Sequence, residues 1–339
     1  MHCMDWKNKL LRSGSCLCFV CLLLCGCTAE KKETISFFAM DTIMQMTAYG
    51  DSAQDGLTQV RDTVETLAVV LDAQKEDSVL SNLHSGDAVP YFIQYPLNIA
   101  KHIEALTGGA LDITLYNLTD AWGFCKKEYS VPQSVEIQRL LASRGQWAID
   151  GNIYTCTDGT KLDFGSLAKG YAADQCVEIL KNSGVTSAIL SLGGNVQTLG
   201  QKPDGSDWVV SVTDPLSPDG TVGTLRVGEC AVVTSGSYQR CFEMNGKTYH
   251  HILDPKTGYP ADNGLISVTV VCDSGTAADG LSTALFVLGA EQAAKLYKTS
   301  DIPFEALWIT EQNDIYLTEG LYPLFEQTNE AYAPAKVLS

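Results

Sequence analysis

The segment from residue 162 to 170, with the sequence LDFGSLAKG, combines a carboxylate, glycines and a lysine at short spacing. Asp163 follows an apolar residue, Gly165 allows close backbone approach, and Lys169 falls where a helix is expected to begin. Free N–H groups at a helix start bind anions, and a lysine adds positive charge. We expect a strand to deliver Asp163 to this site. An ordinary helix cap and turn use the same residue types, so both interpretations stay open.

Two further segments have the composition of a binding site. Gly193 and Gly194 directly follow a short apolar run, where they either make a tight turn or let a ligand lie on bare backbone. After the residues TSGSY at 234–238, the stretch 249–260 contains His250 and His251, followed by Asp254. On a strand, adjacent side chains point to opposite faces, so we expect only one of the two histidines to face a site. A surface turn with a hydrogen-bonded histidine is the alternative.

The fourth segment lies at 273–285 and carries oxygen ligands on a predicted helix. Asp279 and Thr283 are four residues apart, so their oxygens share one helix face, with Ser282 beside them. Hard oxygen ligands of low charge suit Mg²⁺, which keeps its waters and binds substrate phosphates. Polar groups on an otherwise apolar helix are costly unless they bind something. A helix-capping pair is the alternative for Asp279 and Thr283.

Composition narrows the possible ligands. The chain has 339 residues, 45% of them hydrophobic, which is enough for a core without a disulfide framework. Its net charge of −17 argues against nucleic-acid binding, because affinity for the phosphate backbone comes from Lys and Arg. A phosphorylated ligand therefore has to be held locally, by backbone amides, a few cations or a metal. The cysteines beyond residue 27 form no CxxC pair, so zinc spacing is absent and they are expected to be small buried hydrophobes.

The N-terminus has the pattern of a secretion signal. Lys7, Lys9 and Arg12 precede an apolar run at 16–26, which is too short to span a bilayer. The run ends in the sequence LCGC at 24–27, which resembles a bacterial lipobox with Cys27 as the lipidated residue. We therefore expect a lipoprotein signal peptide at 1–27, a polar tether at 28–34, and attachment to the cell membrane on its extracytoplasmic face. An uncleaved signal anchor is the alternative.

The elements that must position these residues alternate irregularly between helices and strands. Helices are expected at 56–71, 96–107, 167–182, 277–288 and 291–298. Strands are expected at 35–49, 188–192, 209–213, 224–227, 230–234, 242–244 and 265–272. Without a regular strand–helix–strand rhythm, this order favours an α+β fold over a doubly wound sheet. No segment has the composition of a linker, so 35–339 is expected to form a single catalytic domain.

From about Phe37 to its end, the chain resembles the ApbE family of FAD:protein FMN transferases. The blocks AMDT at 39–42, GALDIT at 109–114 and AWGF at 121–124 precede the segments described above, and all occur in the order of that family. The order and spacing of these blocks are more specific than any one of them. The resemblance implies an α+β, T-fold-related domain with mixed and antiparallel sheets and packed helices.

The resemblance also implies roles for individual residues. The implied FAD contacts are Met40, Ala110, Leu111, Asp112, Asp163, Lys169 and Leu253. The implied Mg²⁺ ligands are Ser166, through its carbonyl, Asp279 and Thr283, and the implied catalytic residue is His251. Two positions depart from some members of the family: Gln74 replaces an aromatic flavin neighbour, and Ser282 replaces an aspartate.

The implied reaction is Mg²⁺-dependent transfer of FMN from FAD to a threonine or serine hydroxyl of an acceptor protein, with release of AMP. His251 is the candidate base for the hydroxyl proton, because a neutral imidazole accepts protons near pH 7. The implied acceptors belong to membrane redox complexes of the Rnf or sodium-pumping NADH:quinone oxidoreductase type. Two alternatives stay open: a metal-dependent FAD pyrophosphatase that gives FMN and AMP, and a non-catalytic flavin-binding lipoprotein.

Overall fold

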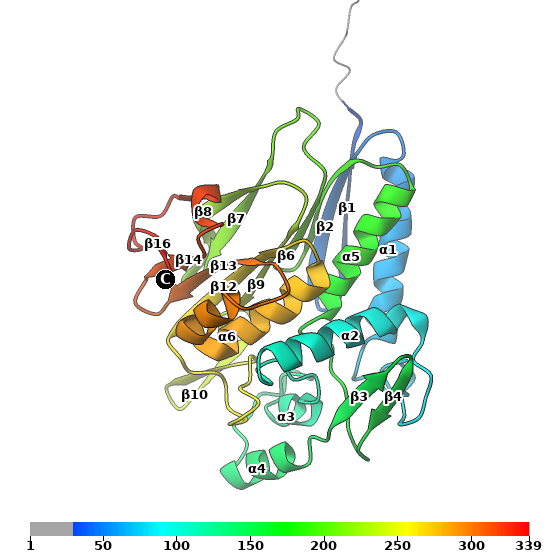
Figure 1. Cartoon of the computed structure of the whole chain (residues 1–339), viewed down its shortest axis with the longest axis vertical. Coiled ribbons are helices and arrows are strands. Elements are labelled where there is room, and N and C mark those ends of the chain that lie inside the picture. Colours follow the sequence, from blue (N-terminus) through cyan, green and yellow to red (C-terminus); the bar gives the residue numbers. More distant parts are fainter. Residues whose placement is uncertain (1–29, 339) are drawn as a thin grey trace, which may run out of the picture.

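The computed structural model describes residues 30–338, and its centre is a large mixed sheet (Figure 1). Within the described residues the sheet has nine strands in the order β1-β2-β5-β6-β9-β12-β13-β14-β16. Their bounds are β1 Lys32–Ala39, β2 Thr42–Tyr49, β5 Ser187–Leu192, β6 Asn195–Leu199, β9 Ala231–Gly236, β12 Leu265–Cys272, β13 Glu305–Thr310, β14 Ile315–Leu317 and β16 Lys336–Val337. Neighbours pair antiparallel except β14 and β16, which are parallel. The expected α+β class with mixed and antiparallel sheets is confirmed.

Three small sheets and the helices complete the architecture of residues 30–338. The small sheets are β15-β8-β7 (Phe325–Gln327, Ser217–Val227, Trp208–Asp214), β10-β11 (Cys241–Met244, Lys247–His250) and β3-β4 (Trp147–Asp150, Ile153–Cys156). The α-helices are α1 Ala53–Val70, α2 Tyr91–Leu106, α3 Tyr116–Ala121, α4 Ser134–Ala142, α5 Ala168–Asn182 and α6 Gly275–Tyr297, and a 3₁₀ helix η1 covers Tyr322–Leu324.

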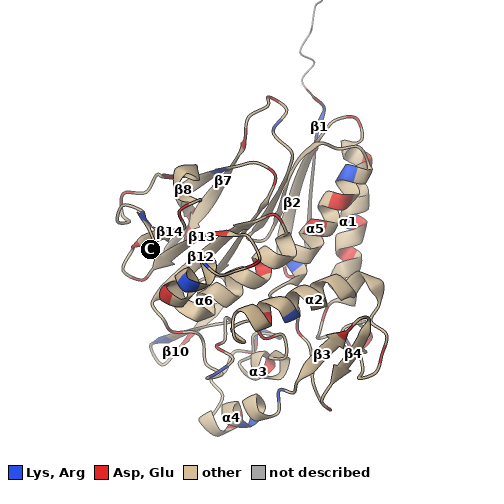
Figure 2. Ribbon diagram, in the orientation of Figure 1, with Lys and Arg blue, Asp and Glu red and all other residues tan. Residues whose placement is uncertain are grey.

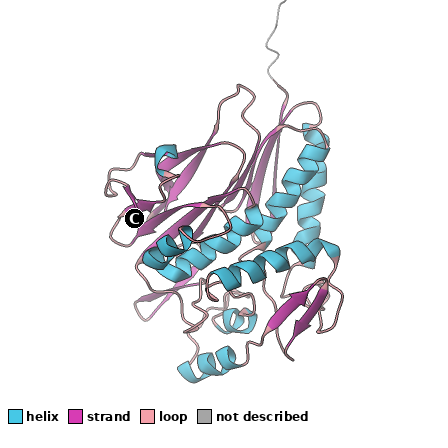
Figure 3. Ribbon diagram, viewed as in Figure 1, coloured by secondary structure: helices cyan, strands magenta, loops and turns pink. Residues whose placement is uncertain are grey.

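The layers follow from the alternation of side chains along the strands. Ala306 and Trp308 of β13 pack with α6 on one face of the sheet, while Leu307 and Ile309 pack on the other face with β7 and β8. Helices α1 and α5 extend the first layer over β1, β2 and β5 (Figure 3). The small sheet of β7, β8 and β15 therefore covers the face opposite the helices.

Several expectations about secondary structure need correction. The run 35–49 is a hairpin, because Met40 and Asp41 turn the chain at positive φ (47° and 61°) without a glycine or proline to signal it. Helix α2 begins at Tyr91, five residues earlier than expected, and contains Pro96. Asp163 does not follow a strand; its N–H donates to the Ile113 carbonyl at 2.7 Å. The two helices expected from 277 to 298 form α6, interrupted at Gly289 (φ 76°).

The structure describes only part of the N-terminal segments expected from the sequence. Strand β1 begins at Lys32, inside the expected tether, while the expected signal peptide and Cys27 lie outside the described residues. Across residues 30–338, no helix combines the length and apolarity needed to cross a bilayer. The six cysteines in this part of the chain are free thiols. Figure 2 shows acidic and basic positions spread over the helices and loops.

Candidate active site

A cavity of about 620 Å³ opens where several turns and helix starts meet at the end of the large sheet. Every residue for which a flavin contact is implied lines this cavity: Met40, Ala110, Leu111, Asp112, Asp163, Lys169 and Leu253. Ser166, Thr283 and His251 line it as well. Residues separated by up to 243 positions of sequence, from Met40 to Thr283, therefore meet at one site. Gln74 is exposed and does not belong to the cavity wall.

The double glycine makes the tight turn that its sequence suggested, and it lies in the cavity wall. Gly193 and Gly194 have φ values of 62° and 95°, so they make the tight turn between β5 and β6. Both also line the cavity. A Cβ at Gly193 would lie 2.3 Å from Thr42 Oγ1, so this turn packs directly against the β1–β2 turn. Glycine is needed there for backbone conformation and for close approach.

Helices α5 and α6 are joined at their N-terminal ends by two carboxylates. Asp279 of α6 accepts a hydrogen bond from the Gly170 N–H of α5 at 2.9 Å. Asp174 of α5 accepts from the Gly275 and Thr276 N–H groups of α6, at 2.6 and 2.9 Å, and from the Ser274 and Thr276 hydroxyls. Each helix thus satisfies unpaired N–H groups at the start of the other. This arrangement fixes the position of Asp279.

The residues implied as metal ligands offer hard oxygen atoms. Asp279 does not line the cavity directly; it is 4% exposed, and no hydrogen bond reaches its second oxygen from the described residues. Thr283 lies one turn further along α6 and reaches the cavity. Within residues 30–338, no three His, Cys, Asp or Glu side chains cluster so as to hold a metal. This donor set, with one carboxylate and neutral oxygens, fits Mg²⁺ that also binds substrate phosphates.

Ser282 is directed into the protein. It is fully buried, its hydroxyl donates to the Asp279 carbonyl at 2.8 Å, and Ser235 Oγ lies 2.8 Å from it. Ser235 Oγ also lies 3.3 Å from Thr283 Oγ1. The serine at this position therefore supports the helix turn that carries Asp279 and Thr283, and it does not line the cavity.

His251 is neutral and oriented by the backbone. Its Nδ1 lies 3.2 Å from the Arg240 carbonyl, an arrangement in which Nδ1 carries the proton and Nε2 keeps a lone pair. Burial, together with the positive charges of Arg240 and Lys169, lowers the pKa of His251 to about 3. The imidazole is therefore uncharged at neutral pH, although it is a weaker base than an ordinary histidine.

His250 lies on the other side of the chain, as the alternation of a strand predicts. It is 9% exposed, its Nε2 lies 3.0 Å from the Ala261 carbonyl, and its ring packs on Phe286 at 5.5 Å between centroids. Burial lowers its pKa. This histidine belongs to the core beneath α6 and has no access to the cavity.

The structure also reveals a cation that the sequence did not single out. Arg240 lines the cavity, and its Nη2 donates to the Phe124 carbonyl at 2.7 Å. Burial raises the pKa of Asp163, whereas the Gly165 N–H at 2.8 Å, Arg240 and Lys169 oppose that rise. The sequence contained one signal that could have identified Arg240. It follows the TSGSY segment by two residues and is one of few arginines in an acidic chain.

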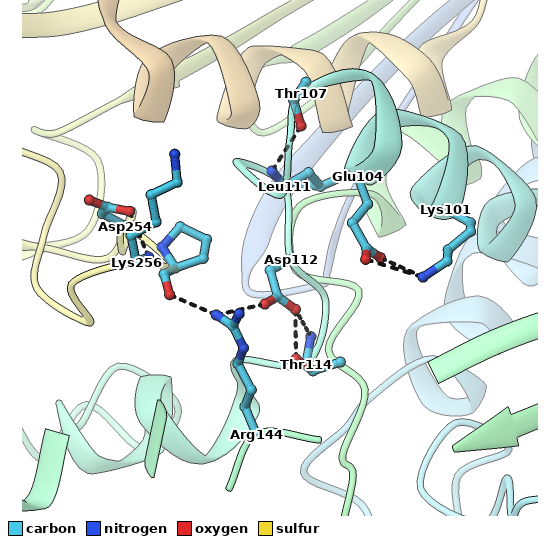
Figure 4. A network of polar contacts seen from close by, with 10 residues as sticks. Lys101, Glu104, Thr107, Leu111, Asp112, Thr114, Arg144, Asp254 and Lys256 are labelled. Atoms are coloured by element: carbon cyan, nitrogen blue, oxygen red, sulfur yellow. Dashed lines mark hydrogen bonds and ion pairs between the residues drawn. The ribbon is translucent and has the colours of Figure 1, made fainter. Parts of the chain in front are cut away.

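A second arginine, Arg144, braces two walls of the cavity (Figure 4). Its guanidinium lies 3.2 Å from Asp112 Oδ2 and donates to the Pro255 carbonyl at 2.6 Å. The other oxygen of Asp112 accepts from the N–H and hydroxyl of Thr114, at 2.8 and 2.6 Å. Both oxygens of Asp112 are therefore engaged, and the brace links the 110–114 loop to the segment that carries His251 and Leu253.

Comparisons with known proteins identify the family of the chain. The model of the ApbE family matches residues 40–308. The FAD:protein FMN transferase of Klebsiella pneumoniae is 31% identical over 301 residues, which cover 86% of this chain and 92% of the relative. That of Haemophilus influenzae is 27% identical over 351 residues, 95% of this chain and all of the relative.

Solved structures extend the likeness to the fold. The ApbE protein of Thermotoga maritima superposes with a TM-score of 0.79 at 28% identity, covering 88% of this chain and 100% of that one. The flavin transferase ApbE of Vibrio cholerae gives 0.77 at 26% identity, with 87% and 99% covered.

Proposed function

We infer the reaction from family membership. The chain belongs to the ApbE family and, like its relatives in Klebsiella pneumoniae and Haemophilus influenzae, is an FAD:protein FMN transferase. We propose that it transfers FMN from FAD to a threonine or serine hydroxyl of an acceptor protein, that AMP leaves, and that the reaction depends on Mg²⁺. The observation that carries the proposal is the convergence of His251, Thr283 and two cations on one cavity, with Asp279 one helical turn before Thr283 and behind the cavity wall.

The cavity supports binding of a dinucleotide in spite of the acidic chain. Lys169 and Arg240 both line it and both act electrostatically on His251 and Asp163. These groups are suited to the pyrophosphate, and the apolar wall of Met40, Leu111 and Leu253 is suited to the flavin ring.

Asp279, Thr283 and the carbonyl of Ser166 would hold the metal. Bound Mg²⁺ supplies positive charge that offsets the pyrophosphate oxygens and makes AMP a better leaving group. The chain's contribution is to present one carboxylate oxygen of Asp279 unpaired, since the other is held by Gly170.

In the transfer, the acceptor oxygen forms a bond to the FMN-side phosphorus, and the bond from that phosphorus to the AMP oxygen breaks. The hydroxyl proton passes to Nε2 of His251, whose lone pair is free because Nδ1 faces the Arg240 carbonyl. Burial is the main cause of the low His251 pKa and the charges of Arg240 and Lys169 add to it, so negative charge from the substrate would offset the part that these two cations contribute. His251 thereby becomes a stronger base when FAD is bound.

A single assay separates this proposal from its alternatives. The full-length protein in detergent is incubated with FAD, Mg²⁺ and a purified flavin-carrying subunit of the Rnf or sodium-pumping NADH:quinone oxidoreductase type. Release of AMP together with a fluorescent acceptor band on a denaturing gel supports transfer. AMP and free FMN without a band indicate a pyrophosphatase, and intact FAD indicates a binding protein without turnover.

We also propose that the protein is a lipoprotein anchored at Cys27 on the extracytoplasmic face of the cell membrane. The support is the lipobox-like sequence LCGC at 24–27. Metabolic labelling with a palmitate analogue tests it: Cys27→Ser should lose the label and stay unprocessed, whereas Cys25→Ser should be labelled and processed normally. Label retained without Cys27 would contradict the assignment.

A further inference from the structure

Two large apolar side chains stand exposed beside the mouth of the cavity. Phe38 of β1 is 66% exposed and Ile43 of β2 is 70% exposed. They are direct partners in the register of the hairpin. The turn between them contains Met40 and Asp41, which line the cavity. The exposed pair is thus continuous with the cavity rim.

The apolar character is confined to the cavity end of this hairpin face. Further along the same face, Thr34 and Ser36 of β1 and Gln45 and Thr47 of β2 are polar, and the hydroxyls of Thr34 and Thr47 lie 2.9 Å apart. The buried face of the hairpin is separate and carries Met44, Met46 and Ala48. Exposure of Phe38 and Ile43 therefore contributes nothing to the core, and a contiguous exposed apolar group typically marks an interaction site.

A third exposed apolar residue comes from a different sheet. Leu216, which is 65% exposed, lies in the turn of the β7–β8 hairpin, where Asp214 pairs with Ser217. Thr213, three residues before it, lines the cavity. We call Phe38, Ile43 and Leu216 together the rim patch. Each of its members is within three residues of a residue in the cavity wall.

We propose that the rim patch docks the acceptor protein, through apolar side chains that flank the hydroxyl residue entering the cavity. This inference rests on the proposed function, because transfer to a protein requires a polypeptide segment to cross the rim. The patch carries no charge. Its contribution to acceptor binding therefore does not depend on electrostatic attraction to this chain, whose net charge is −17. A contact of this kind is insensitive to salt.

The position of the patch favours a protein over the membrane as its occupant. The chain enters β1 at Lys32, and the patch lies at the other end of that strand, next to Met40. Eight residues of extended strand span about 26 Å. With the lipid anchor proposed above at Cys27, the bilayer is expected on the Lys32 side of the hairpin, at its polar end and away from Phe38 and Ile43.

The test compares acceptor binding with FAD binding in the full-length protein. The acceptor in this test is a purified flavin-carrying subunit of a sodium-pumping NADH:quinone oxidoreductase. In the double variant Phe38→Ser/Ile43→Ser, the KM for this acceptor should rise tenfold or more. The Kd for FAD should stay within twofold of the wild-type value. Leu216→Ser should raise the same KM by less. Tyr91→Ser is the matched control, because Tyr91 is 89% exposed and lies outside the cavity wall.

The other outcomes are distinguishable. An acceptor KM unchanged in the double variant, while the wild type flavinylates the acceptor, overturns the patch and leaves the proposed function standing. A wild type that cleaves FAD without labelling the acceptor overturns both. Sedimentation with phosphatidylglycerol vesicles that disappears in the double variant assigns the patch to a membrane. A concentration-dependent dimer that disappears in the double variant assigns it to a second copy of the chain.

Discussion

The two sides of the cavity are built on opposite principles. At the α5–α6 junction, polar groups are buried and paired: Asp174 and Asp279 each bind backbone N–H groups of the other helix, and Asp279 is 4% exposed. At the rim patch, large apolar side chains are left in solvent, with Ile43 at 70%. A buried polar junction can hold ligand atoms in fixed positions, whereas an exposed apolar rim gains stability only when a partner covers it.

The comparison separates where chemistry and recognition are expected. Changes at the junction or around His251 should affect metal use and turnover with the acceptor KM unchanged. Changes at the rim patch should raise the acceptor KM and leave metal use and turnover unchanged. The predictions below test the junction side, beginning with the largest expected effect.

Asp279→Ala should abolish Mg²⁺-dependent release of AMP, because it removes the only carboxylate in the proposed ligand set. The Kd for FAD should rise less, since the flavin contacts proposed for Met40, Leu111 and Leu253 would remain. AMP release and an FAD titration across Mg²⁺ concentrations check this. Near-normal turnover at ordinary Mg²⁺ would place the metal elsewhere.

His251→Ala should lower the single-turnover rate of FMN transfer by ~10²–10⁴-fold, the usual effect of losing a general base. FAD affinity should change only a few-fold. His250→Ala is the matched control: it should lower thermal stability, because His250 packs on Phe286 and binds the Ala261 carbonyl, with a much milder loss of rate. Equal rate losses in the two variants, or a His251 defect limited to FAD affinity, would refute the base assignment.

Asp174→Asn should raise the Mg²⁺ concentration for half-maximal activity by roughly tenfold, in the range seen for residues that orient metal ligands. The amide cannot accept all the hydrogen bonds from residues 274–276, so α6 shifts and takes Asp279 with it. Thr276→Val, which removes one of those bonds, should give a smaller rise.

The control for Asp174 is Glu305→Gln. Glu305 accepts from Tyr297 at the far end of the same helix. This variant should lower the Tm without changing the Mg²⁺ requirement. The second readout is the Mg²⁺-induced rise in Tm with FAD bound, which should shrink in Asp174→Asn alone. An equal loss of the Mg²⁺-induced rise in Tm in both variants would show that Asp174 has a purely structural role.

The smallest effect concerns pH. A histidine with its ordinary pKa of 6.5 gains a proton as pH falls through that value, and the rate would fall about tenfold per unit below it. Because the pKa of free His251 is lowered to about 3, the residue stays neutral from pH 8 to pH 5. The kcat/KM for FAD, which reports the free enzyme, should therefore be flat over this range. A fall centred near pH 6.5 would show an unperturbed histidine.

The sequence singled out most of the residues that meet at the cavity, but it missed parts of the fold around them. Helices with a clear apolar period, such as α5, were placed within one residue, because burial of one face sets their extent. The β1–β2 turn was missed because Met40 and Asp41 adopt positive φ without glycine, held by the packing of the Gly193 turn against Thr42. Such tertiary constraints leave no local signal.

The site residues carried different amounts of information. Asp279, Thr283 and His251 stood in unusual local combinations, so their types and spacing already indicated chemistry. Arg240 and Arg144 act through contacts with residues more than a hundred positions away, Phe124 and Pro255 respectively, and neither belongs to a motif. Their roles depend on the folded chain. The pKa of His251 likewise depends on burial that a sequence pattern does not report.

The close crossing of α5 and α6 limits which amino-acid substitutions this enzyme can accept during evolution. A Cβ at Gly170 would lie 2.1 Å from the Gly275 carbonyl oxygen, and one at Gly275 would lie 2.7 Å from the Gly170 carbonyl oxygen. Neither glycine can be replaced alone without separating the helices, and no replacement of one makes room for a side chain on the other. Drift elsewhere in the two helices is open, but the crossing point itself has no stepwise route to another residue pair. Libraries that aim to alter metal preference should therefore vary the residues around Thr283 and leave this glycine pair untouched.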